Sequence, residues 1–122
     1  MICINLIRVS ADSKYLDINV ETSLGYVLDT LQIDRYDGFS WDSGKDFSSF
    51  LTKEIKVDKD GNTIWKTDED GDFILENGFK IPETINKKKQ VLRINLEEVF
   101  GGSGMFKITM TQKWIGEKGQ EP

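Results

Sequence analysis

The stretch 90–116 constrains the fold more than any other part of the sequence. Apolar and polar residues alternate in two runs, one before Val99 and one after Gly104. A period of two places successive side chains on opposite faces of a strand, so each run predicts a strand with one apolar and one solvated face. Between the runs, Val99 and Phe100 precede a glycine-rich segment. This pattern predicts a short helical or turn-like corner that tucks both residues under the sheet.

Short alternating runs separated by turn residues recur along the rest of the chain. The clearest run is Leu16 to Glu21. The run 25–34 alternates less strictly and favours a bulged strand, with a helix from Ser23 as the weaker alternative. Asp46 precedes apolar residues at helical spacing, which predicts a short helix. Turns roughly every 8–12 residues are typical of a sandwich or barrel.

We therefore predict an all-β antiparallel β-sandwich, Ig-like or jelly-roll-like, with one short helix in an insertion. The 122 residues suffice for a single domain, 1–122, with a core of its own. The alternation stops after Arg35 and a loop follows to Lys45, so we place the insertion near 36–65. The segment 116–122 lacks an apolar anchor, and we expect it to be a flexible tail.

Composition argues against several classes of function. The chain has no histidine, which is the commonest general base and a common zinc ligand, so we expect no enzyme activity and no cofactor. The net charge is -5, and the only basic run, 87–89, precedes a strand. We therefore expect no sequence-specific nucleic acid binding. Every apolar run is far shorter than the roughly 20 residues of a membrane span, which predicts no membrane insertion.

Two acidic segments that begin at Asp58 and Asp68 invite comparison with calcium loops. Each contains Asp-x-Asp-Gly, with glycine at the fourth position. An EF-hand loop needs glycine at position 6 and a glutamate at position 12, between two helices. Asp-Gly between short apolar runs is instead the strongest local signal of a hairpin turn. We predict turns here, and a weak surface calcium site is the minor alternative.

Aromatic residues in a polar loop are candidates for an interface, because exposed aromatic side chains often anchor protein partners. The unanchored C-terminal segment is the second candidate contact region. The predicted interface residues are Tyr36, Phe39, Trp41, Trp65, Ile115 and Pro122. The aromatic loop also fits a platform on which a sugar ring could stack.

Four segments carry a resemblance to a known group of proteins. They are Ile7–Glu21 (Ile-Arg-Val-Ser-Ala-Asp-Ser-Lys-Tyr-Leu-Asp-Ile-Asn-Val-Glu), Leu31–Asp34 (Leu-Gln-Ile-Asp), Val91–Phe100 (Val-Leu-Arg-Ile-Asn-Leu-Glu-Glu-Val-Phe) and Gly104–Met110 (Gly-Met-Phe-Lys-Ile-Thr-Met). The pattern resembles small β-sandwich structural proteins of crAss-like tailed bacteriophages. These proteins form rings in the neck or tail, or accompany the capsid.

The resemblance implies a non-enzymatic virion structural protein, made in the host bacterial cytoplasm and assembled into the virion. The implied partners are other virion proteins, namely portal, neighbouring ring, tail or capsid subunits, and copies of the chain itself in a cyclic homo-oligomer. The alternative from the residues alone is a carbohydrate- or protein-binding β-sandwich module that uses the aromatic loop.

Overall fold

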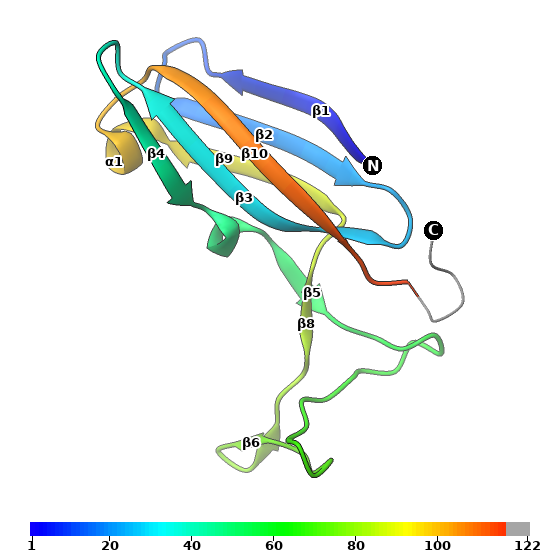
Figure 1. Cartoon of the computed structure of the whole chain (residues 1–122). Helices are drawn as coiled ribbons and strands as arrows, with labels where there is room; N and C mark the ends of the chain where they lie inside the picture. Colours follow the sequence, from blue (N-terminus) through cyan, green and yellow to red (C-terminus); the bar gives the residue numbers. More distant parts are fainter. Residues whose placement is uncertain (117–122) are drawn as a thin grey trace. The chain divides into compact units, whose positions relative to one another are not determined.

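Antiparallel strands make up most of the computed structural model, which describes residues 1–116 (Figure 1). All six pairs of neighbouring strands among the described residues are antiparallel. The chain divides into two units: the first joins residues 1–52 to the segment that begins at Lys87, and the second is Lys53–Asn86. We call the first unit the sandwich and the second the ribbon. The predicted all-β class is confirmed.

The first sheet of the sandwich has the strand order β1-β2-β9. Its strands are β1 (Ile2–Val9), β2 (Tyr15–Thr22) and β9 (Lys89–Asn95). In β2, Leu16, Ile18 and Val20 are buried while Asp17 and Asn19 between them are less so, which confirms the predicted alternation. A bulge shifts the register of β1 between Ile4 and Leu6.

The second sheet has the strand order β10-β3-β4. Its strands are β3 (Tyr26–Tyr36), β4 (Trp41–Asp46) and β10 (Met105–Trp114). β3 is a strand along its whole length and pairs with β10 from Tyr26 to Tyr36, with a register shift between Thr111 and Gln112. The bulged-strand prediction for this run is therefore confirmed, and the helix alternative is wrong.

The loop predicted between Arg35 and Lys45 is wrong in its second half, because β4 lies there. The N–H of Asp37 donates a hydrogen bond to the carbonyl of Ser40 at 3.2 Å, which closes a tight turn. β4 then pairs with β3, starting at Tyr36 and Trp41. An edge strand is held by backbone hydrogen bonds to one neighbour, so it needs no strict alternation of side chains.

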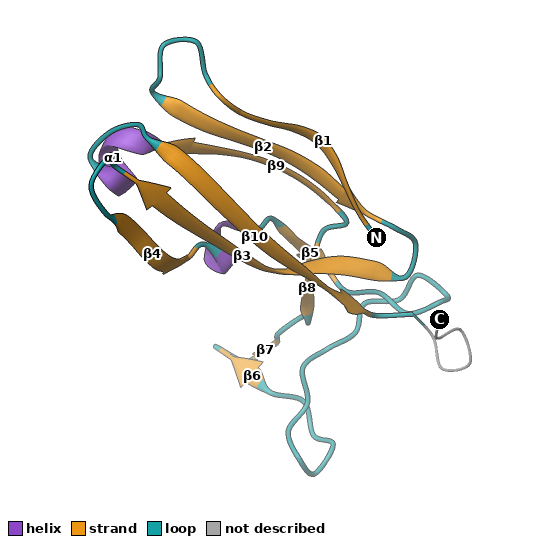
Figure 2. Ribbon diagram, turned by 45° about the horizontal axis from the view of Figure 1, so that its top comes forward, coloured by secondary structure: helices purple, strands orange, loops and turns teal. Residues whose placement is uncertain are grey.

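The two sheets of the sandwich form two layers (Figure 2). The hydrophobic core draws on both sheets and on the segments that connect them. Its buried members are Leu16, Ile18, Val20, Leu28, Leu31, Ile33, Phe47, Leu51, Ile94, Leu96 and Phe100. Every one of these residues belongs to the sandwich. The burial that stabilises the sandwich is therefore provided by the sandwich itself.

A short helix, α1 (Leu96–Phe100), forms the predicted corner. The side chain of Asn95 caps it by accepting a hydrogen bond from the N–H of Glu98 at 3.1 Å. Phe100 is buried and Val99 packs against the core, as predicted. Because β9 and β10 belong to different sheets, the corner carries the chain from one sheet to the other.

The short helix predicted after Asp46 is only one 3₁₀ turn, η1 (Ser48–Phe50). The N–H of Phe47 donates to the carbonyl of Leu31 at 2.7 Å, and the Ser48 hydroxyl accepts from the N–H of Leu31 at 3.1 Å. These two bonds tie the segment to β3. Leu51 already has extended backbone angles, φ -63° and ψ 132°, so the helix ends after this one turn.

The ribbon contains four short strands in two pairs. They are β5 (Lys53–Ile55) with β8 (Thr84–Asn86), and β6 (Leu75–Glu76) with β7 (Phe79–Lys80). A single bridge between Trp65 and Pro82 lies between these pairs along the chain. The ribbon overlaps the predicted insertion near 36–65 only in part, because 36–52 belong to the sandwich.

Candidate functional site

The turn between β3 and β4 assembles part of the predicted aromatic interface. Tyr36 and Trp41 pair across the two strands, with ring centroids 5.4 Å apart. Phe39 lies in the turn with 95% of its surface exposed. The Asp37 carboxylate fixes the turn by accepting from the N–H groups of Ser40 at 3.0 Å and Phe39 at 2.8 Å. These two bonds lower the pKa of Asp37, because they favour its charged form.

The other predicted interface residues lie elsewhere. Trp65 is in the ribbon, opposite Pro82. Ile115 follows β10, and its N–H donates to the carbonyl of Gly25 at 2.7 Å. Pro122 lies outside the described residues. The structure therefore places only Tyr36, Phe39 and Trp41 in one turn.

The two Asp-Gly segments of the ribbon form turns of the same geometry, as predicted. Oδ1 of Asp58 accepts hydrogen bonds from the N–H groups two and four residues later, both at 2.9 Å. Oδ1 of Asp68 does the same, with both bonds at 3.0 Å. Gly61 and Gly71 have φ of 84° and 85°, a region that glycine reaches without strain. Among residues 1–116, no group of side chains suited to holding a metal is found.

These turns belong to an internal repeat. Residues 56–65 and 66–75 share Lys at the first position, Asp-x-Asp-Gly from the third, and Ile at the ninth. The backbone repeats as well. The N–H of Ile64 donates to the carbonyl of Lys56 at 3.0 Å, and the N–H of Ile74 donates to the carbonyl of Lys66 at 3.0 Å. In each repeat the chain therefore makes an excursion that begins at the Lys and ends at the Ile, where it resumes the extended path that it had left.

The extended path that the repeats leave and resume is one side of an antiparallel ladder, which the two turns interrupt. On the returning side, β7, the isolated bridge at Pro82 and β8 follow one another from Phe79 to Asn86 with no turn between them. On the outgoing side, the residues that face it come from successive repeats: Ile55 faces Thr84, Trp65 faces Pro82 and Leu75 faces Lys80. Each ten-residue repeat therefore advances the ladder by two residues of the returning strand, or about 6.6 Å.

The register gives the ladder two distinct faces. Because Thr84, Pro82 and Lys80 alternate along one strand, they and the residues opposite them share one face. We call it the Trp65 face, and its members are Ile55, Trp65, Leu75, Lys80, Pro82 and Thr84. Residues next to these along the chain point the other way. We call that side the Ile74 face, and its apolar members are Ile64, Ile74, Phe79, Ile81 and Ile85.

Apolar side chains of the ribbon are widely exposed. Every residue of Lys53–Asn86, all of which are described, is exposed or half-buried. Its exposed large apolar residues are Ile55, Val57, Trp65, Phe73, Ile74, Leu75 and Phe79. These side chains lie on both faces of the ladder and beside its turns. The ribbon therefore offers two partly apolar surfaces rather than one.

Most of the negative charge of the ribbon lies in its two turns. The acidic residues of the two turns are Asp58, Asp60, Asp68, Glu69, Asp70 and Asp72. Charges along the ladder are mixed: Lys53, Glu54, Lys56, Lys66, Glu76, Lys80 and Glu83. Lys56 lies 3.9 Å from Glu83, and the Lys80 ammonium lies 4.1 Å from the centroid of the Phe73 ring. The turns therefore carry the negative charge, while the ladder is close to balanced.

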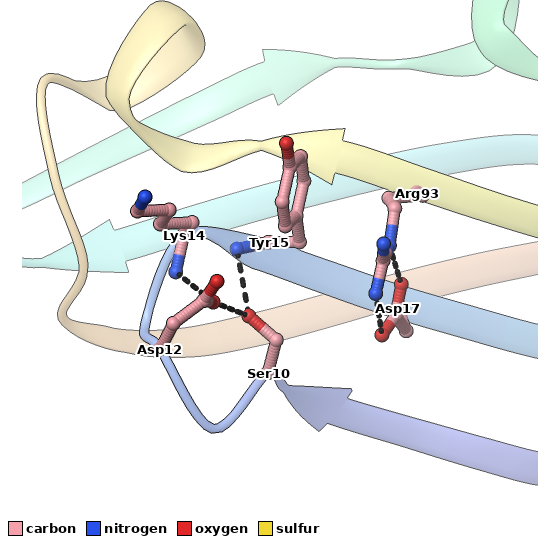
Figure 3. Close-up of polar contacts among 6 residues, drawn as sticks. All are labelled: Ser10, Asp12, Lys14, Tyr15, Asp17 and Arg93. Atoms are coloured by element: carbon pink, nitrogen blue, oxygen red, sulfur yellow. Dashed lines mark hydrogen bonds and ion pairs between the residues drawn. The ribbon is translucent and has the colours of Figure 1, made fainter.

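A polar cluster lies at the other candidate site, the turn between β1 and β2 (Figure 3). An open pocket of about 510 Å³ is lined by Arg8, Val9, Ser10, Ala11, Asp12, Tyr15 and Arg93. Arg93 binds Asp17 through two contacts, at 2.8 and 3.3 Å, and lies over the ring of Tyr15 at 4.4 Å. Both oxygens of Asp17 are thus occupied by one guanidinium.

These contacts set the charge of the cluster. The hydrogen bond from Arg93 lowers the pKa of Asp17, and the same bond raises the pKa of Arg93. Asp12 accepts from the Ser10 hydroxyl at 2.6 Å and from the N–H of Lys14 at 3.1 Å, and both bonds lower its pKa. Because each carboxylate is held by a partner within the cluster, we interpret the cluster as structural support for the turn and for the pairing of β2 with β9.

Replacing Arg93 by Gln should raise the pKa of Asp17 towards its ordinary value of 3.8. The bond that favours the charged carboxylate is then lost. Since the pKa is lowered in the folded protein, Arg93 contributes stability above the unfolded pKa and loses this contribution as the pH falls through the folded pKa. Titration of the Asp17 carboxyl by NMR measures the shift.

Arg8→Gln is the matched control, since Arg8 faces Asp17 from β1 and acts on it only through space. Its shift should be clearly smaller. Equal shifts in the two variants would show that the hydrogen bond to Arg93 is not the main cause.

Gln90 bridges the two residues of the sandwich between which the ribbon is inserted. Its side chain has no exposed surface. Oε1 accepts from the N–H of Thr52 at 2.8 Å, and Nε2 donates to the carbonyls of Thr52 and Lys87, both at 2.9 Å. The N–H of Lys87 also donates to the carbonyl of Thr52 at 2.9 Å. The chain therefore leaves and re-enters the sandwich at adjacent, hydrogen-bonded residues.

Sequence reasoning missed both Gln90 and the repeat. A glutamine at the start of a strand is a common surface residue, so nothing local distinguished it. The repeat could have been found, because Ile55, Trp65 and Leu75 recur at a spacing of ten residues beside the two Asp-Gly segments.

The fold defines an all-β sandwich protein that carries a repetitive two-stranded ribbon. Comparison with protein families, curated proteins and solved structures finds no significant match to this chain. Within the part of the chain that the structure describes, no helix is long and apolar enough to cross a membrane.

Proposed function

We propose that this protein is a non-enzymatic virion structural protein of a tailed bacteriophage, a ring or collar subunit of the neck or tail or a capsid-accessory protein. The observation that carries the proposal is the ribbon, which exposes apolar side chains on both faces. An isolated two-stranded ladder is only marginally stable in water. A neighbouring protein that covers the apolar surface would stabilise it.

The interface available to such a neighbour is of useful size. Each partner in a standard protein interface buries about 800 Å², which the apolar side chains of the ribbon and the backbone around them can supply. The partners we propose are portal, ring, tail or capsid subunits, including further copies of this chain. The resemblance to structural proteins of crAss-like phages points to the same class.

The charge of the chain is compatible with a position beside packaged or passing DNA. The net charge is -5, and acidic residues concentrate in the ribbon turns. Phosphate backbones are repelled by such a surface, so DNA could pass without binding. The proposal therefore includes no sequence-specific nucleic acid binding. Synthesis would take place in the host bacterial cytoplasm and assembly in the virion.

Mass spectrometry of purified particles tests this function. The chain should be present at a stoichiometry that fits a ring or a defined set of capsid positions. Particles assembled with Leu75→Asp in the ribbon should contain at least tenfold less of it, because a buried charge opposes the interface. Val91→Asp on β9 is the matched control, since Val91 is an exposed valine of the sandwich. Absence of the wild-type chain from particles would overturn the proposal.

The turn at Phe39 favours a second candidate function, a carbohydrate- or protein-binding module. Phe39 is almost fully exposed beside the contacting rings of Tyr36 and Trp41. Exposed aromatic rings of this kind stack on sugar rings or fill pockets of a partner. A glycan array separates the two functions: specific binding lost in Trp41→Ala would favour the module. A blank array for a protein found in particles would favour the structural role.

A further inference from the structure

We infer that the ribbons of neighbouring copies of this chain stack on one another, with the Trp65 face of one copy against the Ile74 face of the next. This inference rests on the proposed function in one respect, since both assign the ribbon to assembly. It goes further by naming the partner, the two contact surfaces and their orientation.

Both faces of the ribbon expose apolar side chains that contact with another surface would bury. Ile55, Trp65 and Leu75 expose 52%, 36% and 57% of their surface on the Trp65 face. On the other face, Ile74 exposes 40% and Phe79 exposes 76%. A twofold contact between two identical faces would leave the opposite faces of both copies in water. A head-to-tail contact covers both faces of every ribbon in a closed ring.

Apolar side chains repeat at the same spacing on both faces of the ribbon. Trp65 and Leu75 follow each other along the Trp65 face at one step of the repeat, and Ile64 and Ile74 do the same on the other face. Each step covers two residues of the returning strand, or about 6.6 Å. Two surfaces with the same step can interdigitate along their whole length. A step of about 6.6 Å is common to every β-strand face, so the spacing permits contact between copies, and the need to cover both faces favours a copy as the partner.

The charges of the ribbon are compatible with contact between two copies. Along the ladder, basic and acidic residues alternate closely enough to balance, so stacking two ladders brings no large repulsion. The acidic turns lie at Asp58–Asn62 and Asp68–Asp72, away from the ladder residues. Their repulsion between copies weakens with salt. Association of copies should therefore become stronger at higher ionic strength, whereas binding to a basic partner would become weaker.

Two adjacent residues allow a sharp test, because Leu75 lies on the Trp65 face and Ile74 on the Ile74 face. The same substitution is made at each, Leu75→Asp and Ile74→Asp, in the full chain. Sedimentation velocity at increasing concentration, up to about 1 mM to capture weak contacts, should show oligomers for the wild type. Each variant alone should be a monomer, with association weakened at least tenfold. Val91→Asp on the sandwich should associate like the wild type.

Mixing the two variants distinguishes the geometry. Leu75→Asp keeps an intact Ile74 face and Ile74→Asp keeps an intact Trp65 face, so an equal mixture should form a dimer and nothing larger. A wild-type monomer over the whole concentration range would overturn the inference. So would self-association of Ile74→Asp alone, since that indicates a twofold contact through the Trp65 face. A chain that is found in particles yet stays monomeric would leave the proposed function standing and remove this inference.

Discussion

Excision of the ribbon should leave a folded sandwich that no longer assembles. The change replaces Lys53–Asn86 by Asn-Gly. Every residue of the hydrophobic core lies outside the excised segment. The N–H of Lys87 already donates to the carbonyl of Thr52 at 2.9 Å, the bond that closes a two-residue hairpin turn. Asn-Gly is the preferred sequence for such a turn, so the junction should close without strain.

The expected result has two parts. The free energy of unfolding of the shortened chain should lie within about 1 kcal/mol of the wild-type value, because little buried apolar surface is removed. Incorporation into particles and self-association should both be lost. Chemical denaturation followed by tryptophan fluorescence measures the first part, since Trp41 and Trp114 remain in the sandwich. Particle mass spectrometry and sedimentation measure the second.

A smaller deletion serves as the control. Removing residues 57–64 takes out one turn and joins Lys56 to Trp65, which still faces Pro82 in the ladder. This variant should keep the remaining ladder and assemble more weakly than the wild type but better than the full excision. A shortened chain without the ribbon that fails to fold would contradict the independence of the sandwich. One that enters particles normally would contradict the role of the ribbon.

Gln90→Leu should destabilise the protein by about 3 kcal/mol, because each buried polar group left without a partner costs about 1–3 kcal/mol. The Thr52 N–H and the Lys87 carbonyl both lose the side chain that they bind. The Thr52 carbonyl keeps the bond from the N–H of Lys87. For a chain of this size, the midpoint of thermal unfolding should fall by roughly 10–20 °C.

Gln112→Leu is the matched control for this variant. Oε1 of Gln112 is buried on β10 and has no hydrogen-bond partner among the described residues. Replacing it should therefore be neutral or slightly stabilising. Equal losses for the two variants, measured by thermal and chemical denaturation, would show that the volume of the glutamine matters and its hydrogen bonds do not.

The local alternation of apolar and polar residues was sufficient to predict the strands that have one face towards the core and one towards water. The alternation around Ile18 and along β10 is visible in the sequence because each strand has one face towards the core and one towards water. The corner at Val99 and Phe100 was predictable because a glycine-rich segment follows these residues and separates the two alternating runs. β4 and η1 were mispredicted because backbone bonds to β3 decide their conformation, and such bonds leave little trace in side-chain pattern.

The candidate site was predictable only in pieces. Tyr36, Phe39 and Trp41 are close in sequence, so their common turn could be expected. The two faces of the ribbon could not, because they depend on which residues of 79–86 lie opposite each repeat. A register that differed by one residue would move Trp65 to the other face.

The sequence by itself determined that this protein is an all-β chain with a corner at Val99 and Phe100 and turns at Asp58 and Asp68, since these depend on neighbouring residues. Only the tertiary structure decided that β9 pairs with β2 and β10 with β3, and that Gln90 binds Thr52 and Lys87. Pairing of distant strands and satisfaction of a buried amide are set by contacts that form when the chain folds. Their energies depend on the whole arrangement, which no short stretch of sequence contains.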